Sequence, residues 1–405
     1  MRKVVVLLVI LMGMMLGYTQ SQAAEPIHLG FNDVRSGAFK SNGDKFLLGL
    51  EVAVKEINKA GGLLGRPVEL VVEDNQLKPE IAVQKLRKMI QSDKCEAIFQ
   101  GSSSAVALAI SQAMPRYRKI YIPVAAFAVD ITGRNFEPYM FRTDANTAIQ
   151  AKAMAMYLGK RKEFKKVYMI NMDYAAGHDA ADYFGKFIKE VAPDTEIVGN
   201  DFHPMFNKDF APYISKIKAS GADYVLTQNW GTDLIQFIIQ SRSLGLKIPI
   251  AGILMADINA MAAMPGDEAV GNFGVASFMP GLETPEAKKL EESFYEKSGG
   301  TWPVEQVWYG YKGMIIYAEA VKKAGSIDAK KVIKAFEGMK WNGPTGTAVM
   351  RAQDHQLMQP MIIGQVVKKT KYFSHPYLKP IQVIPAEQLD YKPEELGWKP
   401  YKEEK

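Results

Sequence analysis

Residues 97–128 read AIFQGSSSAVALAISQAMPRYRKIYIPVAAFA, and the fold follows from this stretch. The pattern predicts a short apolar strand at Ala97–Phe99, a tight glycine turn, a helix over Ala105–Met114 and a second strand at Ile120–Ile122. Pro115 ends the helix because proline cannot continue it. A strand, a helix and a second strand in this order are typical of the parallel sheets of α/β proteins.

Three serines, Ser102, Ser103 and Ser104, stand where this helix begins. The first N–H groups of a helix have no intrahelical acceptor and the helix dipole is positive there, so this end can bind an anion. The small-residue loop Val124–Ala128 follows the next strand, and open parallel sheets bind ligands in the crevice where such loops meet. The alternative is a simple helix cap, because serine is common at that position.

Residues 1–24 are predicted to be a secretory signal peptide. Arg2 and Lys3 precede an apolar run from Val4 to Leu16, and small residues around Ala23 offer a cleavage site. The alternative, a transmembrane anchor, needs about 20 apolar residues, and this run is shorter. The remaining chain is long enough, at 47% hydrophobic residues, to bury two cores of ordinary size.

Charge and cysteine content exclude several classes of protein. Loss of the signal peptide lowers the formal net charge from +6 to +4, and the basic residues are scattered, which argues against nucleic-acid binding. Cys95 is the only cysteine, so no intrachain disulfide can form. The five histidines show no metal-ligand spacing. The chain also lacks the common nucleophile, zinc-protease and phosphate-binding motifs, so we expect neither an enzyme nor a cofactor.

Strands and helices alternate along most of the chain. Predicted strands before the Ser-rich turn are Ile27–Phe31 and Val68–Glu73, with helices over Asp44–Ala60 and Glu80–Ser92. The pattern begins again beyond Arg142, with helices at 147–158, 178–191, 209–220 and 232–244 and strands at 166–171, 196–202, 224–227 and 248–252. Two such sets argue for two parallel-sheet domains.

The last third of the chain departs from a simple tandem arrangement. Residues 273–279 are predicted to form a strand, and helices follow at 285–298, 304–324 and 328–338. Two further segments, Ala348–Arg351 and Met358–Val367, are predicted to form a hairpin-like pair. The tail from Lys371, rich in proline and tyrosine, is predicted to be irregular.

The order of these features resembles the type I periplasmic solute-binding proteins, in particular the leucine/isoleucine/valine-binding branch. The resemblance covers about residues 25–370 and is carried by short motifs whose order and spacing match. These are SG…G at 36–43, EINKAGGLLG at 56–65, EDN at 73–75, GSSS at 101–104, AA at 125–126, DY…G at 173–177 and GPTG at 343–346.

The family fold implies two lobes, each a parallel sheet flanked by helices, joined by three hinge crossings. The N-terminal lobe would comprise residues 25–142 and 277–345, and the C-terminal lobe residues 143–276 and 346–370, with a C-terminal extension at 371–405. The crossings would fall near Phe141–Asn146, Phe273–Met279 and Thr345–Thr347.

The resemblance also implies where a ligand would bind. In amino-acid-binding members, a serine of the Ser-rich turn and an Ala-Ala-Thr loop grip the carboxylate, while that loop and a glutamate hold the ammonium. Ser102 matches the serine, and Phe127 and Leu254 stand where the family has threonine and glutamate. The implied ligand-binding residues are Asn42, Ser102, Ser103, Ser104, Ala125, Ala126, Phe127, Tyr174, Trp230 and Leu254.

The two residues that differ from the family pattern, Phe127 and Leu254, affect which ligand can bind. A buried ammonium without a carboxylate partner is strongly disfavoured, so Phe127 and Leu254 favour an aromatic or short-chain organic acid over a free amino acid. Two alternatives stay open. Asp257 would restore the amino-acid interpretation if the alignment slipped by three residues, and Arg35 could contact the carboxylate or be an exposed loop residue.

Membership of this family implies that the protein is the periplasmic substrate-binding component of an ABC importer of the branched-chain amino acid type. Its partners would be a small solute and an inner-membrane ABC permease, and the chain is expected to be monomeric. A branched-chain or other amino-acid binding protein of the same family is one alternative, and a periplasmic ligand-sensing receptor subunit is another.

Overall fold

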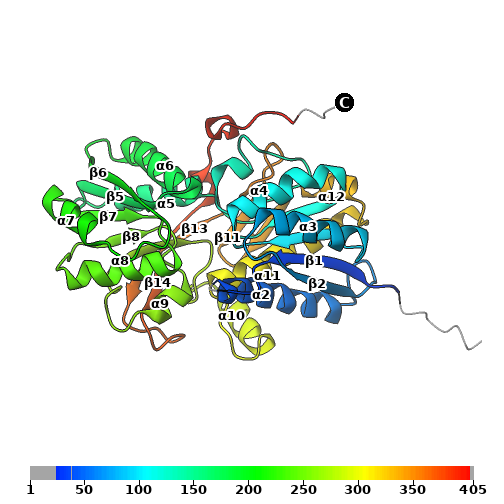
Figure 1. The fold of residues 1–405 in the computed structure, drawn as a ribbon. Helices are drawn as coiled ribbons and strands as arrows, with labels where there is room; N and C mark the ends of the chain where they lie inside the picture. Colours follow the sequence, from blue (N-terminus) through cyan, green and yellow to red (C-terminus); the bar gives the residue numbers. More distant parts are fainter. Residues whose placement is uncertain (1–23, 38, 402–405) are drawn as a thin grey trace, which may run out of the picture.

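The computed structural model describes residues 24–37 and 39–401; the predicted signal peptide lies almost entirely outside them. The molecule has two lobes side by side, each a β-sheet covered by helices (Figure 1). None of the helices in the described residues is long and apolar enough to span a bilayer.

The first lobe is built on a four-stranded parallel sheet in the order β2-β1-β3-β4. Its strands are β1 (Ile27–Asp33), β2 (Val68–Asp74), β3 (Ala97–Gln100) and β4 (Ile120–Pro123). Its helices here are α2 (Lys40–Lys59), α3 (Pro79–Gln91) and α4 (Ser104–Ala113), with short 3-10 turns η1 (Met114–Arg116) and η2 (Val129–Ile131). The stretch predicted to decide the fold therefore forms β3, α4 and β4 as expected.

The second lobe holds a seven-stranded sheet in the order β14-β13-β9-β8-β7-β5-β6. The strands β5 (Lys166–Met172), β6 (Glu196–His203), β7 (Tyr224–Thr227), β8 (Ile250–Gly252) and β9 (Phe273–Ala276) run parallel. The helices are α5 (Thr147–Leu158), α6 (Ala175–Val191), α7 (Ala211–Ser220), α8 (Gly231–Ser243) and α9 (Ile258–Ala263). The helix α9 was not predicted from the sequence.

After β9 the chain returns to the first lobe through α10 (Pro285–Lys297), α11 (Glu305–Ala324) and α12 (Ala329–Phe336). The helix α11 packs closely on α2, because glycines stand where the two backbones meet: a Cβ on Gly49 would lie 2.0 Å from the Val307 carbonyl oxygen. The same holds for Gly310, where a Cβ would lie 2.1 Å from the Phe46 carbonyl oxygen. This close approach brings the first two turns of α11 beside residues 46–50, in the middle of α2.

The predicted hairpin is wrong in part. The strand β11 (Gly346–Met350) pairs with β10 (Lys340–Gly343) and with β12 (Leu357–Met358) in a small separate sheet. The rest of the second predicted segment is β13 (Met361–Val367), which pairs with β9 in the large sheet. The chain thus joins the second lobe's sheet at Met361, between β12 and β13, and not near Thr345–Thr347 as predicted.

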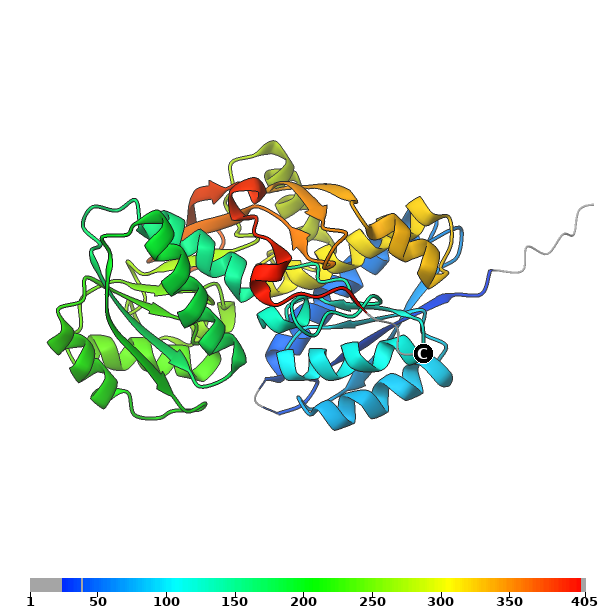
Figure 2. The ribbon, with the colours of Figure 1, turned by 90° about the horizontal axis from the view of Figure 1, so that it is seen from above.

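The tail is also not irregular. Residues 377–384 form β14 (Tyr377–Ile384), the edge strand of the seven-stranded sheet, antiparallel to β13. This strand was not predicted because it contains Pro380, and a proline within an apolar run argues against a strand. Proline is nevertheless tolerated in a strand at the edge of a sheet. The tail continues through α13 (Ala386–Leu389) and η3 (Pro393–Leu396) and crosses from the second lobe to the first (Figure 2).

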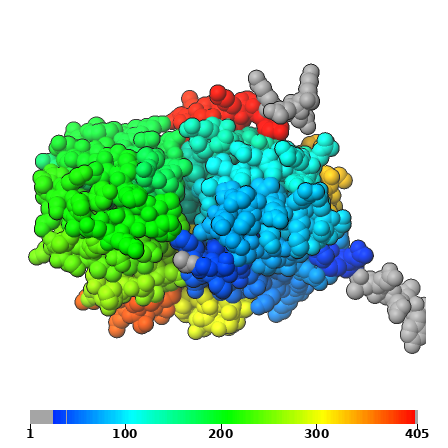
Figure 3. Space-filling view, viewed as in Figure 1, coloured from blue at the N-terminus to red at the C-terminus, as the bar shows by residue number. Residues whose placement is uncertain are grey.

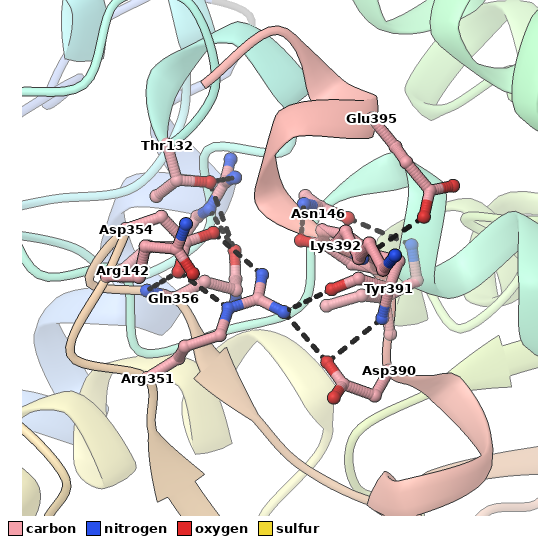
Figure 4. A network of polar contacts seen from close by, with 12 residues as sticks. Thr132, Arg142, Asn146, Arg351, Asp354, Gln356, Asp390, Tyr391, Lys392 and Glu395 are labelled. Atoms are coloured by element: carbon pink, nitrogen blue, oxygen red, sulfur yellow. Dashed lines mark hydrogen bonds and ion pairs between the residues drawn. The ribbon is translucent and has the colours of Figure 1, made fainter. Parts of the chain in front are cut away.

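The crossing tail is tied to both lobes. Arg351 donates to Asp354 and also to the Asp390 carboxylate and the Tyr391 carbonyl of the tail (Figure 4). The Lys186 ammonium of α6 lies 2.6 Å from the Glu395 carboxylate, while the Trp398 ring contacts Phe136 of the first lobe.

Replacing Tyr391 with phenylalanine is expected to lower the free energy of unfolding by about 1 kcal/mol. The buried Asn146 amide donates to the Tyr391 hydroxyl at 2.7 Å, and the variant leaves that amide hydrogen without this acceptor. Urea unfolding measures the change. The matched control is Tyr295→Phe at an exposed ring, where no change above about 0.5 kcal/mol is expected; equal changes in both variants would contradict the structural role.

One buried ammonium holds the three crossing segments together. Lys312 Nζ of α11 donates to Asp144 Oδ2 at 3.1 Å, to Ser277 Oγ at 3.2 Å and to Gln359 Oε1 at 2.7 Å. Asp144 lies between β4 and α5, Ser277 follows β9, and Gln359 lies between β12 and β13. Each of the three chain connections between the lobes therefore contributes one polar partner to Lys312.

Candidate functional site

A cavity of about 490 Å³ lies between the two lobes, which are in contact along their junction (Figure 3). Contacts across the junction include Asn259 Nδ2, which donates to Asn42 Oδ1 at 2.9 Å, and the Val129 N–H, which donates to Asp179 Oδ2 at 2.9 Å. The cavity is lined by Phe39, Asn42, Phe46, Leu77, Ser102, Ser103, Ser104, Ala105, Leu108, Ala125, Phe127, Tyr174, Ala175, Ala176, Met205, Phe206, Trp230, Leu254, Asp257, Glu305, Gln306 and Tyr309.

The structure brings nine of the ten predicted ligand-binding residues to this one cavity. The exception is Ala126, whose side chain packs into the core of the first lobe with Ile98 and Met140. Its carbonyl oxygen accepts from Arg142 Nη1 at 3.2 Å. Asn42 lines the cavity from within α2, which begins at Lys40; the predicted helix start at Asp44 was therefore wrong.

The three serines of the turn have different roles. Ser103 is the N-cap of α4, where its Oγ accepts from the Val106 N–H at 3.3 Å, and Ser104 Oγ accepts from the Ala128 N–H at 3.1 Å. The Ser102 hydroxyl is buried at the cavity, makes no well-formed hydrogen bond within the described residues, and lies near enough to Asp33 to lower the pKa of that carboxyl. The first N–H groups of α4, at Ser104 and Ala105, have no intrahelical acceptor. The helix-cap interpretation is therefore confirmed for Ser103, and the anion-site interpretation stays a prediction for Ser102.

Asp33, at the end of β1, holds this turn in place and was not singled out from the sequence. Its Oδ2 accepts from the Gly101 N–H at 2.8 Å and the Ser102 N–H at 3.1 Å, and its Oδ1 accepts from the Val34 N–H at 2.7 Å. Burial raises the pKa of Asp33 to about 6, although these hydrogen bonds oppose the increase.

This pKa predicts a pH-dependent stability. Because the folded protein holds the Asp33 proton up to about pH 6 and the unfolded chain releases it near 3.8, the free energy of unfolding falls as pH rises between these values. From pH 4.5 to pH 7 the contribution of Asp33 is about 2 kcal/mol. Urea unfolding at both pH values should show this decrease in the wild-type protein and a decrease smaller by that amount in Asp33→Asn. Identical pH dependence in the two proteins would contradict the assignment.

The walls of the cavity are mostly apolar and come from both lobes. Phe39 of the first lobe packs against Trp230 of the second, with ring centroids 4.9 Å apart, and Phe127 packs on Tyr309 at 5.8 Å. Tyr174, before α6, donates its hydroxyl to Gln228 Oε1 at 2.7 Å. A solute in this cavity would bury its body among aromatic rings.

One part of the lining is acidic. Asp257 Oδ1 accepts from the Asn259 and Ala260 N–H groups and from Gln306 Nε2, and its Oδ2 accepts from the Gly231 N–H. Glu305, at the start of α11, is only 3% exposed; burial raises its pKa well above the usual range, and the Tyr309 hydroxyl opposes that increase. Asp257 therefore lines the cavity, which is where the alternative alignment, shifted by three residues, would put it.

Glu305 was missed, because it lies 48 residues beyond Asp257 and reaches the cavity only through the packing of α11 on α2. Arg35, by contrast, is not part of the lining; its Nη1 lies 2.6 Å from Asp44 Oδ1. Within residues 24–37 and 39–401, no group of three or more His, Cys, Asp or Glu side chains is placed to hold a metal ion.

Comparison with known proteins identifies the family. The sequence pattern of the family described as "Periplasmic binding protein" matches residues 26–371. The chain is 29% identical over 370 residues to the Leu/Ile/Val-binding protein homolog 4 of Brucella melitensis biotype 1, with 86% of each chain covered. It is 29% identical over 343 residues to the Leu/Ile/Val-binding protein homolog 7 of Brucella suis biovar 1, covering 78% of this chain and 82% of that relative.

Solved structures agree with this result. A leucine-, isoleucine-, valine-, threonine- and alanine-binding protein from Brucella ovis, in its closed conformation, is 27% identical with a TM-score of 0.83, covering 91% of this chain and 97% of that one. A solute binding protein of an ABC transporter from Rhodopseudomonas palustris, in complex with 3,4-dihydroxybenzoic acid, shares the fold at 24% identity with a TM-score of 0.78, covering 89% and 98%. The chain belongs to the periplasmic binding protein family, as a substrate-binding protein of an ABC transporter of the branched-chain amino acid type.

Proposed function

We propose that this protein captures a small carboxylate-bearing solute with an apolar or aromatic body, an aromatic or short-chain organic acid, between its two lobes. The observation that supports the proposal best is the buried Ser102 hydroxyl, which lies at the start of α4 in a cavity with aromatic walls and is not used in the helix cap. Hydrogen bonds from neutral and backbone donors to a carboxylate are charge-assisted and therefore strong. The remaining nine predicted residues are proposed to position or enclose the solute, Ala126 through the backbone of its loop.

Transport follows from closure of the lobes. Contacts to a solute that exist only in the closed form shift the equilibrium between open and closed forms toward the closed one. We propose that the closed, solute-loaded monomer acts in the periplasm, where residues 1–24 direct it, and delivers the solute to an inner-membrane ABC permease without catalysing a reaction. The Brucella ovis relative, named for five amino acids that it binds, belongs to the same fold and is described as closed.

An amino acid is the second candidate solute, and Asp257 and Glu305 favour it. The expectation of an organic acid relied on the absence of a carboxylate to meet an ammonium group, and the cavity contains two. Both candidate solutes would place a carboxylate at Ser102. They differ in whether the solute also has an ammonium group for Asp257 and Glu305 to bind.

A solute screen tests the proposal. Native mass spectrometry of the purified protein would identify any co-purified solute, and thermal unfolding with amino acids, benzoates and short-chain acids would find those that bind. A solute at 100 times its Kd should add about 2.7 kcal/mol of stability. The proposal fails if the bound solutes have no carboxylate.

A further inference from the structure

The C-terminal segment at residues 385–401 leaves the large sheet after β14 and crosses to the first lobe (Figure 2). We propose that this segment, the strap, stabilises the closed arrangement of the two lobes and slows the release of a bound solute. It acts without touching the solute, because the described residues that line the cavity include none of the strap. The inference rests on the proposed function in one respect, namely that the lobes open and close around a solute.

The first part of the strap is fixed to the second lobe. The side chains of Leu389 and Leu396 are buried in the same apolar core as side chains of α5 and α6. The Lys186 ammonium of α6 lies 2.6 Å from the Glu395 carboxylate. Because exposed ion pairs contribute little, the burial of the two leucines is the main attachment. We therefore expect the strap to move with the second lobe.

The end of the strap lies on residues 129–136 of the first lobe. These residues follow β4 and contribute to the same core as side chains of β3 and β4. The Trp398 ring contacts Phe136, with ring centroids 6.2 Å apart. The two backbones meet at Gly133, where a Cβ would lie 2.4 Å from the Leu396 carbonyl oxygen. A residue with a side chain at position 133 would therefore displace the strap.

The same segment of the first lobe is also in contact with α6 of the second. The Val129 N–H donates to Asp179 Oδ2 at 2.9 Å, and Asp179 lies on the helix whose Lys186 pairs with the strap. The second lobe therefore contacts residues 129–136 twice, through α6 and through the strap. Separation of the lobes breaks such contacts, so their free energy favours the closed form.

Two substitutions, one on each side of the contact, test the strap. Gly133→Ala acts from the first lobe, because the new Cβ collides with the Leu396 carbonyl oxygen. Trp398→Ala acts from the strap and removes the ring that contacts Phe136. Since both variants disrupt one contact, we expect similar effects from each and no larger effect from the double variant.

Each variant has a matched control. Gly185→Ala is on α6, where the new Cβ would have Ile197 Cδ1 as its neighbour at an ordinary 3.6 Å. Ile381→Ala shortens an exposed side chain of β14, which belongs to the same tail but pairs only within the large sheet. Both controls should keep the wild-type balance between open and closed forms.

The separation of the lobes is measured in the empty protein by electron–electron double resonance. Spin labels are attached at Lys78→Cys and Lys208→Cys, two exposed positions close to the cavity residues Leu77 and Phe206. Cys95 is fully buried and should not react. Release of the strap should raise the ratio of open to closed forms by about 3- to 10-fold. Stopped-flow release of the tightest solute of the screen should become faster by a similar factor.

The outcomes separate this inference from the proposed function. An unchanged ratio in Gly133→Ala and Trp398→Ala would refute the strap, and so would effects in the two variants that multiply in the double variant. The distance measurement needs no solute. If no carboxylate-bearing solute binds the wild-type protein, the proposed function fails, while the label distances still decide whether the strap holds the lobes together.

Discussion

Replacing Lys312 with methionine should lower the free energy of unfolding by about 3–5 kcal/mol. The side chains of Lys312 and Asp144 are 0% and 2% exposed, so the variant leaves a buried carboxylate without its cation. Ser277 and Gln359 lose the same partner. Burial lowers the pKa of Lys312, and the nearby Asp144 carboxylate opposes this change. The charged form of Lys312 is therefore stabilised by its hydrogen-bond acceptors. Urea unfolding monitored by circular dichroism measures the loss.

The control is an ion pair of the same kind on the surface. Lys297 lies 2.7 Å from Glu56, with both side chains partly exposed, and Lys297→Met should change stability by no more than about 1 kcal/mol. A double variant, Lys312→Met with Asp144→Leu, should lose less than the sum of the single changes, because the second substitution removes the unpaired charge. Similar losses for Lys312→Met and Lys297→Met would show that the buried pair does not secure the crossings.

Replacing Ser102 with alanine should weaken binding of a carboxylate-bearing solute by ~10- to 150-fold, which corresponds to about 1.5–3 kcal/mol for a hydrogen bond to a charged group. The melting temperature of the empty protein should change little, because the Ser102 hydroxyl makes no well-formed hydrogen bond and Asp33 keeps its hydrogen bonds from the Val34, Gly101 and Ser102 N–H groups. Isothermal titration calorimetry with the tightest solute of the screen measures the effect.

Ser111→Ala is the matched control for this variant. Ser111 is on the same helix, α4, is fully buried and also has an unpartnered hydroxyl, but it does not line the cavity. We expect unchanged affinity in this control. If both variants bind with wild-type affinity, the carboxylate does not lie at the start of α4.

Local sequence patterns predicted most helices and strands. The helix at residues 147–158 and the strand at residues 224–227 have the predicted bounds, since apolar periodicity and clear breakers mark their ends. Elements with weaker signals were mistaken. α2 begins four residues earlier than the predicted Asp44, because Lys40 and Gly43 give no sign of a helix start. β14 was missed because of Pro380.

The sequence by itself determined the two α/β lobes, the serine turn at the start of α4 and most of the residues that surround the cavity, because these depend on periodicity and on turns a few residues long. Only the tertiary structure decided that Glu305 and Asp257 share the cavity, that Lys312 joins the three crossings and that the tail completes a sheet. Such contacts join residues far apart in the chain, and their partners are set by the packing of α11 on α2 and of β13 on β9, which no local pattern records.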